Sequence, residues 1–110
     1  MNDTYPEILS RYFSAVERRD LEVLGTCFTD DATLTDDGRT YRGRDEILAW
    51  RKAAGPAYEF VVEVLDWEHT GDGGYVVDTN VASPVSGAPT ELKFRFTVTD
   101  RLISDLTIAP

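Results

Sequence analysis

Near the start of the chain, apolar residues recur every three or four positions, the spacing of one face of an α-helix. This pattern predicts a first helix over roughly residues 5–18, and its apolar positions are Tyr5, Ile8, Leu9, Tyr12, Phe13 and Val16. A short second helix follows, with Asp20 as its N-cap and with Leu21, Leu24 and Phe28 at helical spacing. Because so few residues separate the two helices, we expect them to pack side by side.

Residues 30–38, DDATLTDDG, predict a strand that ends in an Asp-Gly turn. Side chains alternate along a strand, so Ala32, Leu34 and Asp36 share one face. Asp36 then lies in line with apolar side chains, although a buried charge is costly unless it is paired or hydrated. Two interpretations are open: Asp36 lines a cavity, or it belongs to the turn and bends the chain at the strand end.

The remaining pattern predicts one more helix and then strands. YRGRDEILAWRKAAG, residues 41–55, predicts a third helix with Ile47 and Trp50 on its inner face. From residue 58 onward the alternation has period two, and it predicts a hairpin of EFVVEVLDWEH and YVVDTNVAS around the turn TGDGG, then the strands ELKFRFTVT and RLISDLTIA. The predicted order α-α-β-α-β-β-β-β indicates an α+β fold, in which three N-terminal helices pack on a curved, mostly antiparallel sheet.

The length of the chain limits the number of domains, and its net charge limits the kinds of binding partner. The chain of 110 residues suffices for one core, so we expect a single domain over residues 1–110. Eleven Lys and Arg residues stand against 20 Asp and Glu residues, which gives a formal net charge of −9. This charge repels phosphate backbones and anionic lipids, so we expect neither nucleic acid nor a membrane as a partner.

Cysteine and histidine are scarce. Cys27 and His69 are the only residues of their types, which excludes an intramolecular disulfide and leaves too few ligands for a Cys/His zinc site. We expect no metal and no cofactor. The start of the chain lacks the basic and apolar regions of an export signal, and nowhere do about 18 apolar residues occur together. We therefore expect a cytoplasmic protein.

Four motifs in the N-terminal half carry a family resemblance. They are RY-x-x-A in the first helix, D-L-x-x-L in the second, F-x-D-D-A-T at the first strand and G-x-x-x-I at the third helix. The chain resembles ketosteroid isomerase and the SnoaL-like polyketide cyclases, within the nuclear transport factor 2-like superfamily. The later strands match only in order and alternation. The resemblance implies an NTF2-like (cystatin-like) cone with a pocket between the sheet and the helices, a fold that hosts enzymes, ligand carriers and adaptors.

The resemblance also implies roles for individual residues. In ketosteroid isomerase an aspartate moves a proton, while a tyrosine and a protonated aspartic acid stabilise the enolate oxygen. Tyr12 stands at the tyrosine position and Asp36 at that of the proton-shuttling aspartate, although Tyr12 equally suits core packing. Leu92 replaces the protonated aspartic acid, and Arg51 replaces a supporting tyrosine. Because leucine cannot donate a hydrogen bond, we do not expect an efficient steroid isomerase, and a weaker or different proton transfer stays open.

Several large apolar side chains are candidates for the lining of a pocket that binds a small apolar ligand. They are Phe13, Phe28, Trp50, Tyr58, Trp67, Leu92 and Phe94. Core packing is the alternative for each of them. His69, on the same strand parity as Trp67, is either a second acid-base group or an exposed side chain before a turn.

Two classes of function follow. The first is a cofactor-independent acid-base enzyme of the isomerase, cyclase or lyase type, acting on a small apolar ketone or polyketide-like substrate, with Asp36 as proton shuttle and Tyr12 as oxyanion donor. The alternative is a non-catalytic small-molecule-binding or dimerisation module of the same fold. An adaptor would need an apolar outer sheet face, which Asp78 and Lys93 make polar. The resemblance implies a homodimer through that outer face.

Overall fold

The computed structural model describes residues 5–53, 61–82 and 90–110, which form three helices and six strands. The helices are α1 (Glu7–Arg18), α2 (Leu21–Thr26) and α3 (Gly43–Ala53). The strands are β1 (Phe28–Asp36), β2 (Arg39–Arg42), β3 (Val61–Gly71), β4 (Gly74–Ala82), β5 (Thr90–Thr99) and β6 (Leu102–Ala109). The predicted α+β class is confirmed. Among the described helices, none is long and apolar enough to cross a membrane.

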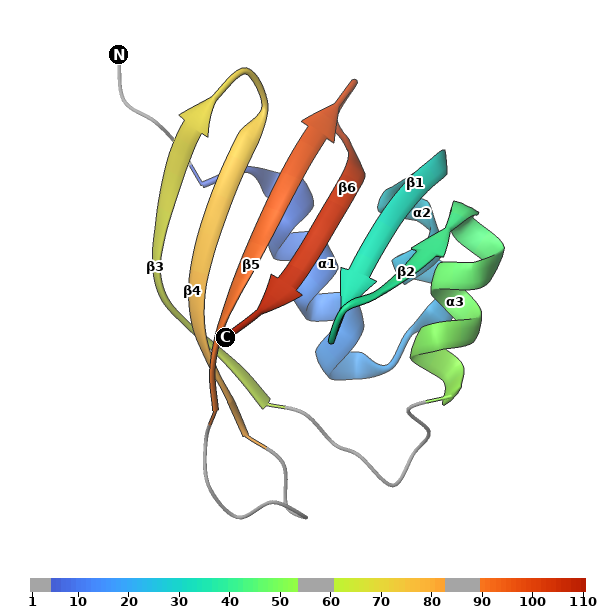
Figure 1. Ribbon diagram of the computed structural model, residues 1–110, viewed down its shortest axis with the longest axis horizontal. Helices are drawn as coiled ribbons and strands as arrows, with labels where there is room; N and C mark the ends of the chain where they lie inside the picture. The colour runs from blue at the N-terminus through green and yellow to red at the C-terminus, as the bar shows by residue number, and fades with distance from the viewer. Residues whose placement is uncertain (1–4, 54–60, 83–89) are drawn as a thin grey trace.

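All six strands belong to one sheet, in the order β2-β1-β6-β5-β4-β3. Neighbouring strands run antiparallel, except that β1 and β6 run parallel. The helices lie against one face of this sheet, and none of the described helices lies on the other face (Figure 1). We call these the inner and the outer face. The predicted arrangement of helices on a mostly antiparallel sheet is therefore present.

Strand β2 was not predicted. Tyr41 and Arg42, expected at the start of the third helix, instead lie in β2 and pair with β1. The Asp37-Gly38 turn joins these two strands as a hairpin, and both of its residues have positive φ, 53° and 78°. That conformation matches the twist of a two-residue hairpin turn, in which Asp-Gly is a favoured pair. The helix consequently begins later, at Gly43.

The two N-terminal helices follow their sequence signals closely. Asp20 caps α2, because its carboxylate accepts a hydrogen bond of 3.1 Å from the backbone N–H of Val23. Between the helices the chain reverses at Arg19, whose φ of 55° is left-handed. The predicted cap and the tight connection are both confirmed, and they direct the apolar side of α1 toward the sheet.

The core fills the space between α1 and the inner sheet face. Tyr12, 1% exposed, is at its centre and packs edge-on against four phenylalanine rings. Those rings belong to Phe13, Phe28, Phe94 and Phe96. Val77 and Thr79 of β4 face the same core, as their strand alternation predicted. Core packing thus places the Tyr12 side chain and orients its hydroxyl end.

Candidate functional site

A cavity of about 150 Å³ lies between the inner sheet face and the helices α1 and α3. The helices contribute Tyr12 and Val16 from α1, and Trp50 and Arg51 from α3. The end of β1 contributes Asp36. Apolar side chains of the other strands complete the lining, namely Val62, Val81, Leu92, Phe94 and Ile108. The result is a small apolar chamber that holds a carboxyl group, a phenol and a guanidinium group.

Asp36 reaches the cavity because it is the last residue of β1 and shares its inward face with Ala32 and Leu34, both fully buried. The indole Nε1 of Trp50 donates a hydrogen bond of 3.3 Å to its Oδ2. Burial raises the pKa of Asp36 above its ordinary value, the Trp50 hydrogen bond lowers it, and the nearby charge of Asp37 raises it. A carboxylate with a raised pKa is a stronger base than one on the surface.

Tyr12 is held by its core contacts, so its phenol belongs both to the core and to the cavity lining. Burial raises the pKa of Tyr12 far above its ordinary value. The positive charge of Arg51 lowers this pKa, and the carboxylate of Asp36 raises it. The hydroxyl therefore stays protonated near neutral pH and is able to donate a hydrogen bond into the cavity.

Arg51 was not predicted as a site residue, yet it is only 8% exposed and lines the cavity. Its Nη2 donates a hydrogen bond of 3.4 Å to the backbone carbonyl of Val16, which connects α3 to α1. Burial lowers the pKa of the guanidinium, the negative charge that Tyr12 carries when ionised raises it, and the charge of Arg19 lowers it. The sequence held a signal for this position, because Arg51 follows the buried Ile47 by four residues and so shares its helix face.

The structure brings together five of the residues that the sequence singled out. Tyr12, Asp36, Trp50, Leu92 and Phe94 all line the cavity. Phe13 and Phe28, 6% and 0% exposed, lie instead in the core around Tyr12 and are not part of the lining. Tyr58 lies outside the described residues.

Trp67 also lies away from the cavity, in a separate aromatic cluster. It packs against the core, but it is five residues beyond Val62 on β3, which corresponds to roughly 16 Å along a strand. There its ring packs against Tyr5 and Tyr75. His69 is exposed and stacks on Tyr75 at a ring-centre distance of 4.7 Å. The alternative of an exposed histidine at a strand end is therefore the correct one.

Leu92 lines the cavity at the position where the resemblance to ketosteroid isomerase implies a protonated aspartic acid. Its side chain is part of the lining, and its backbone carbonyl accepts a hydrogen bond of 2.9 Å from Thr79 Oγ1. A leucine side chain offers no proton to a developing negative charge. In the described residues, no three histidine, cysteine or carboxylate side chains gather closely enough to hold a metal ion.

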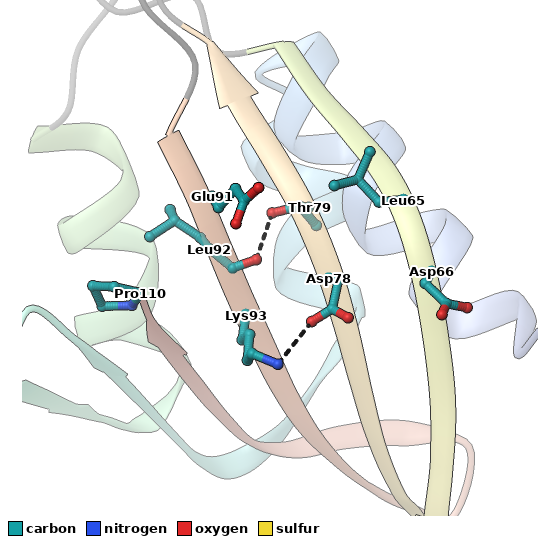
Figure 2. A pocket seen from close by; sticks show the side chains of 8 residues that line it. All are labelled: Leu65, Asp66, Asp78, Thr79, Glu91, Leu92, Lys93 and Pro110. Carbon is teal, nitrogen blue, oxygen red and sulfur yellow. Dashed lines mark hydrogen bonds and ion pairs between the residues drawn. The ribbon is translucent and has the colours of Figure 1, made fainter.

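A second, more open hollow of about 290 Å³ lies on the outer sheet face (Figure 2). Its lining comprises Leu65, Asp66, Asp78, Thr79, Glu91, Leu92, Lys93 and Pro110. Lys93 Nζ and Asp78 Oδ1 form an ion pair of 3.2 Å across β4 and β5. Asp78 is thus already paired, whereas the inner cavity holds a carboxyl group with a raised pKa, that of Asp36, so the inner cavity is the better candidate for chemistry.

Comparison with known proteins assigns the chain to a family. Residues 9–106 match the family model of the SnoaL-like domain. The chain belongs to this SnoaL-like family. A candidate polyketide cyclase from Sinorhizobium meliloti is 33% identical, with a TM-score of 0.88 over 96% of this chain and 95% of that one. None of the curated proteins matches the sequence.

Two other solved structures resemble this SnoaL-like chain in fold. A protein of ketosteroid isomerase-like fold from Catenulispora acidiphila, in complex with trimethylamine, is 23% identical, with a TM-score of 0.84 over 97% of this chain and 87% of that one. A candidate ketosteroid isomerase from Kribbella flavida is 17% identical, with a TM-score of 0.78 over 92% and 73% of the two chains. The predicted family and the nuclear transport factor 2-like fold are both confirmed.

Proposed function

We propose that this SnoaL-like protein is a cofactor-independent acid-base enzyme of the isomerase, cyclase or lyase type. Its substrate would be a small ketone or polyketide-like compound. The observation that carries the proposal is that Asp36 and Tyr12 line the same small, mostly apolar cavity. A base with a raised pKa and a neutral hydrogen-bond donor in one mostly apolar cavity are the two groups that proton transfer beside a carbonyl requires.

In the proposed reaction, the carboxylate of Asp36 removes a proton from the carbon next to the carbonyl group. The electron pair of the broken C–H bond moves to the carbonyl oxygen and forms an enolate. The hydroxyl of Tyr12 donates a hydrogen bond to that oxygen, so the negative charge is stabilised as it develops. Protonated Asp36 then returns the proton to carbon, and return to a different carbon isomerises the substrate.

The size of the cavity supports a narrower choice of substrate. An apolar cavity of about 150 Å³ in another protein accommodates benzene. The cavity of this protein has a similar volume of about 150 Å³. A compound with about one ring fits this space better than a four-ring steroid. Together with the leucine at position 92, this favours proton transfer on small ketones over steroid isomerisation.

Proton exchange in D₂O tests this proposal directly. Cyclohexanone and acetophenone are incubated with the protein, and NMR follows the replacement of hydrogen by deuterium beside the carbonyl. We expect exchange with the wild type and its loss in Asp36→Asn. Asp31→Asn is the matched control, because Asp31 lies on the same strand but is exposed, and asparagine still accepts the hydrogen bond from Thr29 Oγ1. Equal exchange by the wild type and Asp36→Asn would contradict the assignment.

The alternative is a binding module without catalysis. It is favoured by Leu92, which supplies no second donor to an oxyanion. The Catenulispora acidiphila relative holds trimethylamine, so a small molecule occupies at least one protein of this fold. Ketone binding in the absence of any deuterium exchange, unchanged by Asp36→Asn, would favour this second function.

We further propose a homodimer through the outer sheet face and a cytoplasmic location. The ion pair of Lys93 and Asp78 and the exposed carboxylates around it suit a polar, hydrated interface (Figure 2). Leu65, 49% exposed, adds apolar area beside them. The single cysteine suits a reducing compartment. Light scattering should show a dimer. Lys93→Glu should weaken this dimer, because it adds a fourth carboxylate side chain to the hollow. A monomer at all protein concentrations would exclude the proposed homodimer.

A further inference from the structure

The buried guanidinium of Arg51 is the feature that the proposed proton transfer does not use. It lies in the cavity lining with Tyr12 and Asp36, and the side chain is 8% exposed. A charge removed from water is stabilised by groups of opposite charge or by strong hydrogen-bond acceptors. Its hydrogen bond to the Val16 carbonyl holds the planar group at the cavity wall.

We propose that Arg51 is the anion-binding residue of this cavity, and that the ligand is a small oxo acid of about one ring in size. The carboxylate of the ligand would contact the guanidinium, and its carbonyl group would lie toward Tyr12. The carbonyl part of this inference rests on the proposed function. The anion-binding part does not, because it holds equally for a module that binds without catalysis.

The chemistry of arginine supports a carboxylate as the group that is bound. A guanidinium presents N–H donors in one plane, and this geometry matches the two oxygens of a carboxylate. In an apolar chamber the attraction is stronger than in water, because the effective dielectric constant is lower. Aliphatic and aromatic side chains line most of the rest of the cavity and suit the hydrocarbon part of such a ligand.

Because the whole protein is negatively charged, an anionic ligand would bind in the cavity only beside a positively charged side chain. The chain has a formal net charge of −9, so the surrounding potential disfavours anions. Among the lining residues that the structure describes, Arg51 is the one cation, and Asp36 is the one carboxylate. A cationic ligand is the opposite possibility, in which Asp36 and the indole of Trp50 would contact it.

Three ligands of nearly equal size separate these possibilities: benzoate is anionic, benzamide is neutral and benzylammonium is cationic. Their dissociation constants are measured by NMR titration at neutral pH. We expect benzoate to bind the wild type at least about tenfold more tightly than either of the others, as a charge-assisted pair predicts. Arg51→Gln should weaken benzoate binding by about tenfold and change benzamide binding by less than about threefold.

Lys52→Gln is the matched control, because it removes one positive charge from the next residue of α3, which is exposed. It should leave the preference for benzoate intact. Arg51→Lys retains the charge and should keep part of the preference, which guards against a misfolded Arg51→Gln variant. Equal binding of benzoate and benzamide, stronger binding of benzylammonium, or unchanged benzoate binding in a folded Arg51→Gln variant would each overturn the inference.

The failure of this inference is distinguishable from the failure of the proposed function. With 4-oxopentanoate and its methyl ester as exchange substrates, the wild type should exchange the acid faster than the ester, and Arg51→Gln should remove the difference. Exchange without a preference for the acid would overturn the anion site alone. A preference for benzoate without exchange of any ketone would leave the anion site standing and contradict only the enzymatic function.

Discussion

Trp50 donates a hydrogen bond from its indole nitrogen to Oδ2 of Asp36, at 3.3 Å, and thereby connects α3 to the end of β1. The two residues are 14 positions apart and lie in elements separated by the β2 hairpin. The bond stabilises the ionised carboxylate, so it opposes the effect of burial on the same group. The basicity of Asp36 therefore depends on the position of the third helix.

The first prediction concerns this hydrogen bond. Trp50→Phe removes the donor and leaves burial in place, so the pKa of Asp36 should rise further above its ordinary value. The measurement is an NMR titration of the side-chain carboxyl carbon. Trp67→Phe is the control, because Trp67 lies in the separate cluster with Tyr5 and Tyr75. An Asp36 pKa that stays constant or falls in Trp50→Phe would contradict the role of the bond.

The second prediction concerns stability against pH. Asp36 has a raised pKa in the folded state, so the folded state binds this proton more tightly than the unfolded chain does. Protonation therefore stabilises the fold, and this stabilisation is lost as the pH rises through the folded pKa. The free energy of unfolding of Asp36→Asn minus that of the wild type should therefore increase as the pH is raised from about 3 toward 7, because asparagine does not ionise.

Urea unfolding of both proteins over that pH range is the measurement. Asp31→Asn provides the comparison, because Asp31 is on the same strand but exposed, and asparagine still accepts the hydrogen bond from Thr29 Oγ1. Its difference from the wild type should vary less with pH. A difference between Asp36→Asn and the wild type that is constant with pH would show that Asp36 titrates alike in the folded and unfolded states.

The third prediction separates the hydroxyl of Tyr12 from its ring. Tyr12→Phe keeps the aromatic packing, so the free energy of unfolding should change by less than about 1.5 kcal/mol. If the hydroxyl stabilises an enolate, the rate of deuterium exchange should fall by about 10²–10³. A rate loss below threefold would remove Tyr12 from the proposed reaction.

Tyr5→Phe is the matched control for that experiment. The Tyr5 hydroxyl is buried without a hydrogen-bond partner among the described residues, and burial raises its pKa to about 12. Removal of an unsatisfied buried hydroxyl should leave the protein equally stable or more stable. The exchange rate should not change, because Tyr5 is not part of the cavity lining.

The fourth prediction compares two turn glycines with positive φ. A Cβ at Gly73, φ 83°, would lie 2.5 Å from the backbone oxygen of Val98, whereas a Cβ at Gly38, φ 78°, would meet no atom within 4 Å. Gly38→Ala should destabilise the fold by about 1–2 kcal/mol through left-handed backbone strain alone. Gly73→Ala should be worse, because the β3-β4 turn must also move away from β5. Urea unfolding of both variants would show this order, and equal losses would contradict it.

Much of the fold was predictable because its signals are local. The period of apolar residues defined α1, and the capping chemistry of Asp20 defined the start of α2. Alternation assigned Asp36 to the inward face of β1. Strand β2 was missed because four residues are too short for a periodic pattern, and their extended conformation depends on pairing with β1.

The sequence by itself determined the three helices, the five longer strands and the side chains that share a face of each, since these follow from backbone geometry over a few residues. Only the tertiary structure decided that Tyr12 reaches the cavity while Phe28 is enclosed in the core. It likewise decided that Arg51 is buried in the lining of the cavity that Asp36 also lines, where it donates a hydrogen bond to Val16, 35 positions away. Contacts between residues distant in sequence depend on how helices pack against a twisted sheet, and the pattern within one segment does not contain that information.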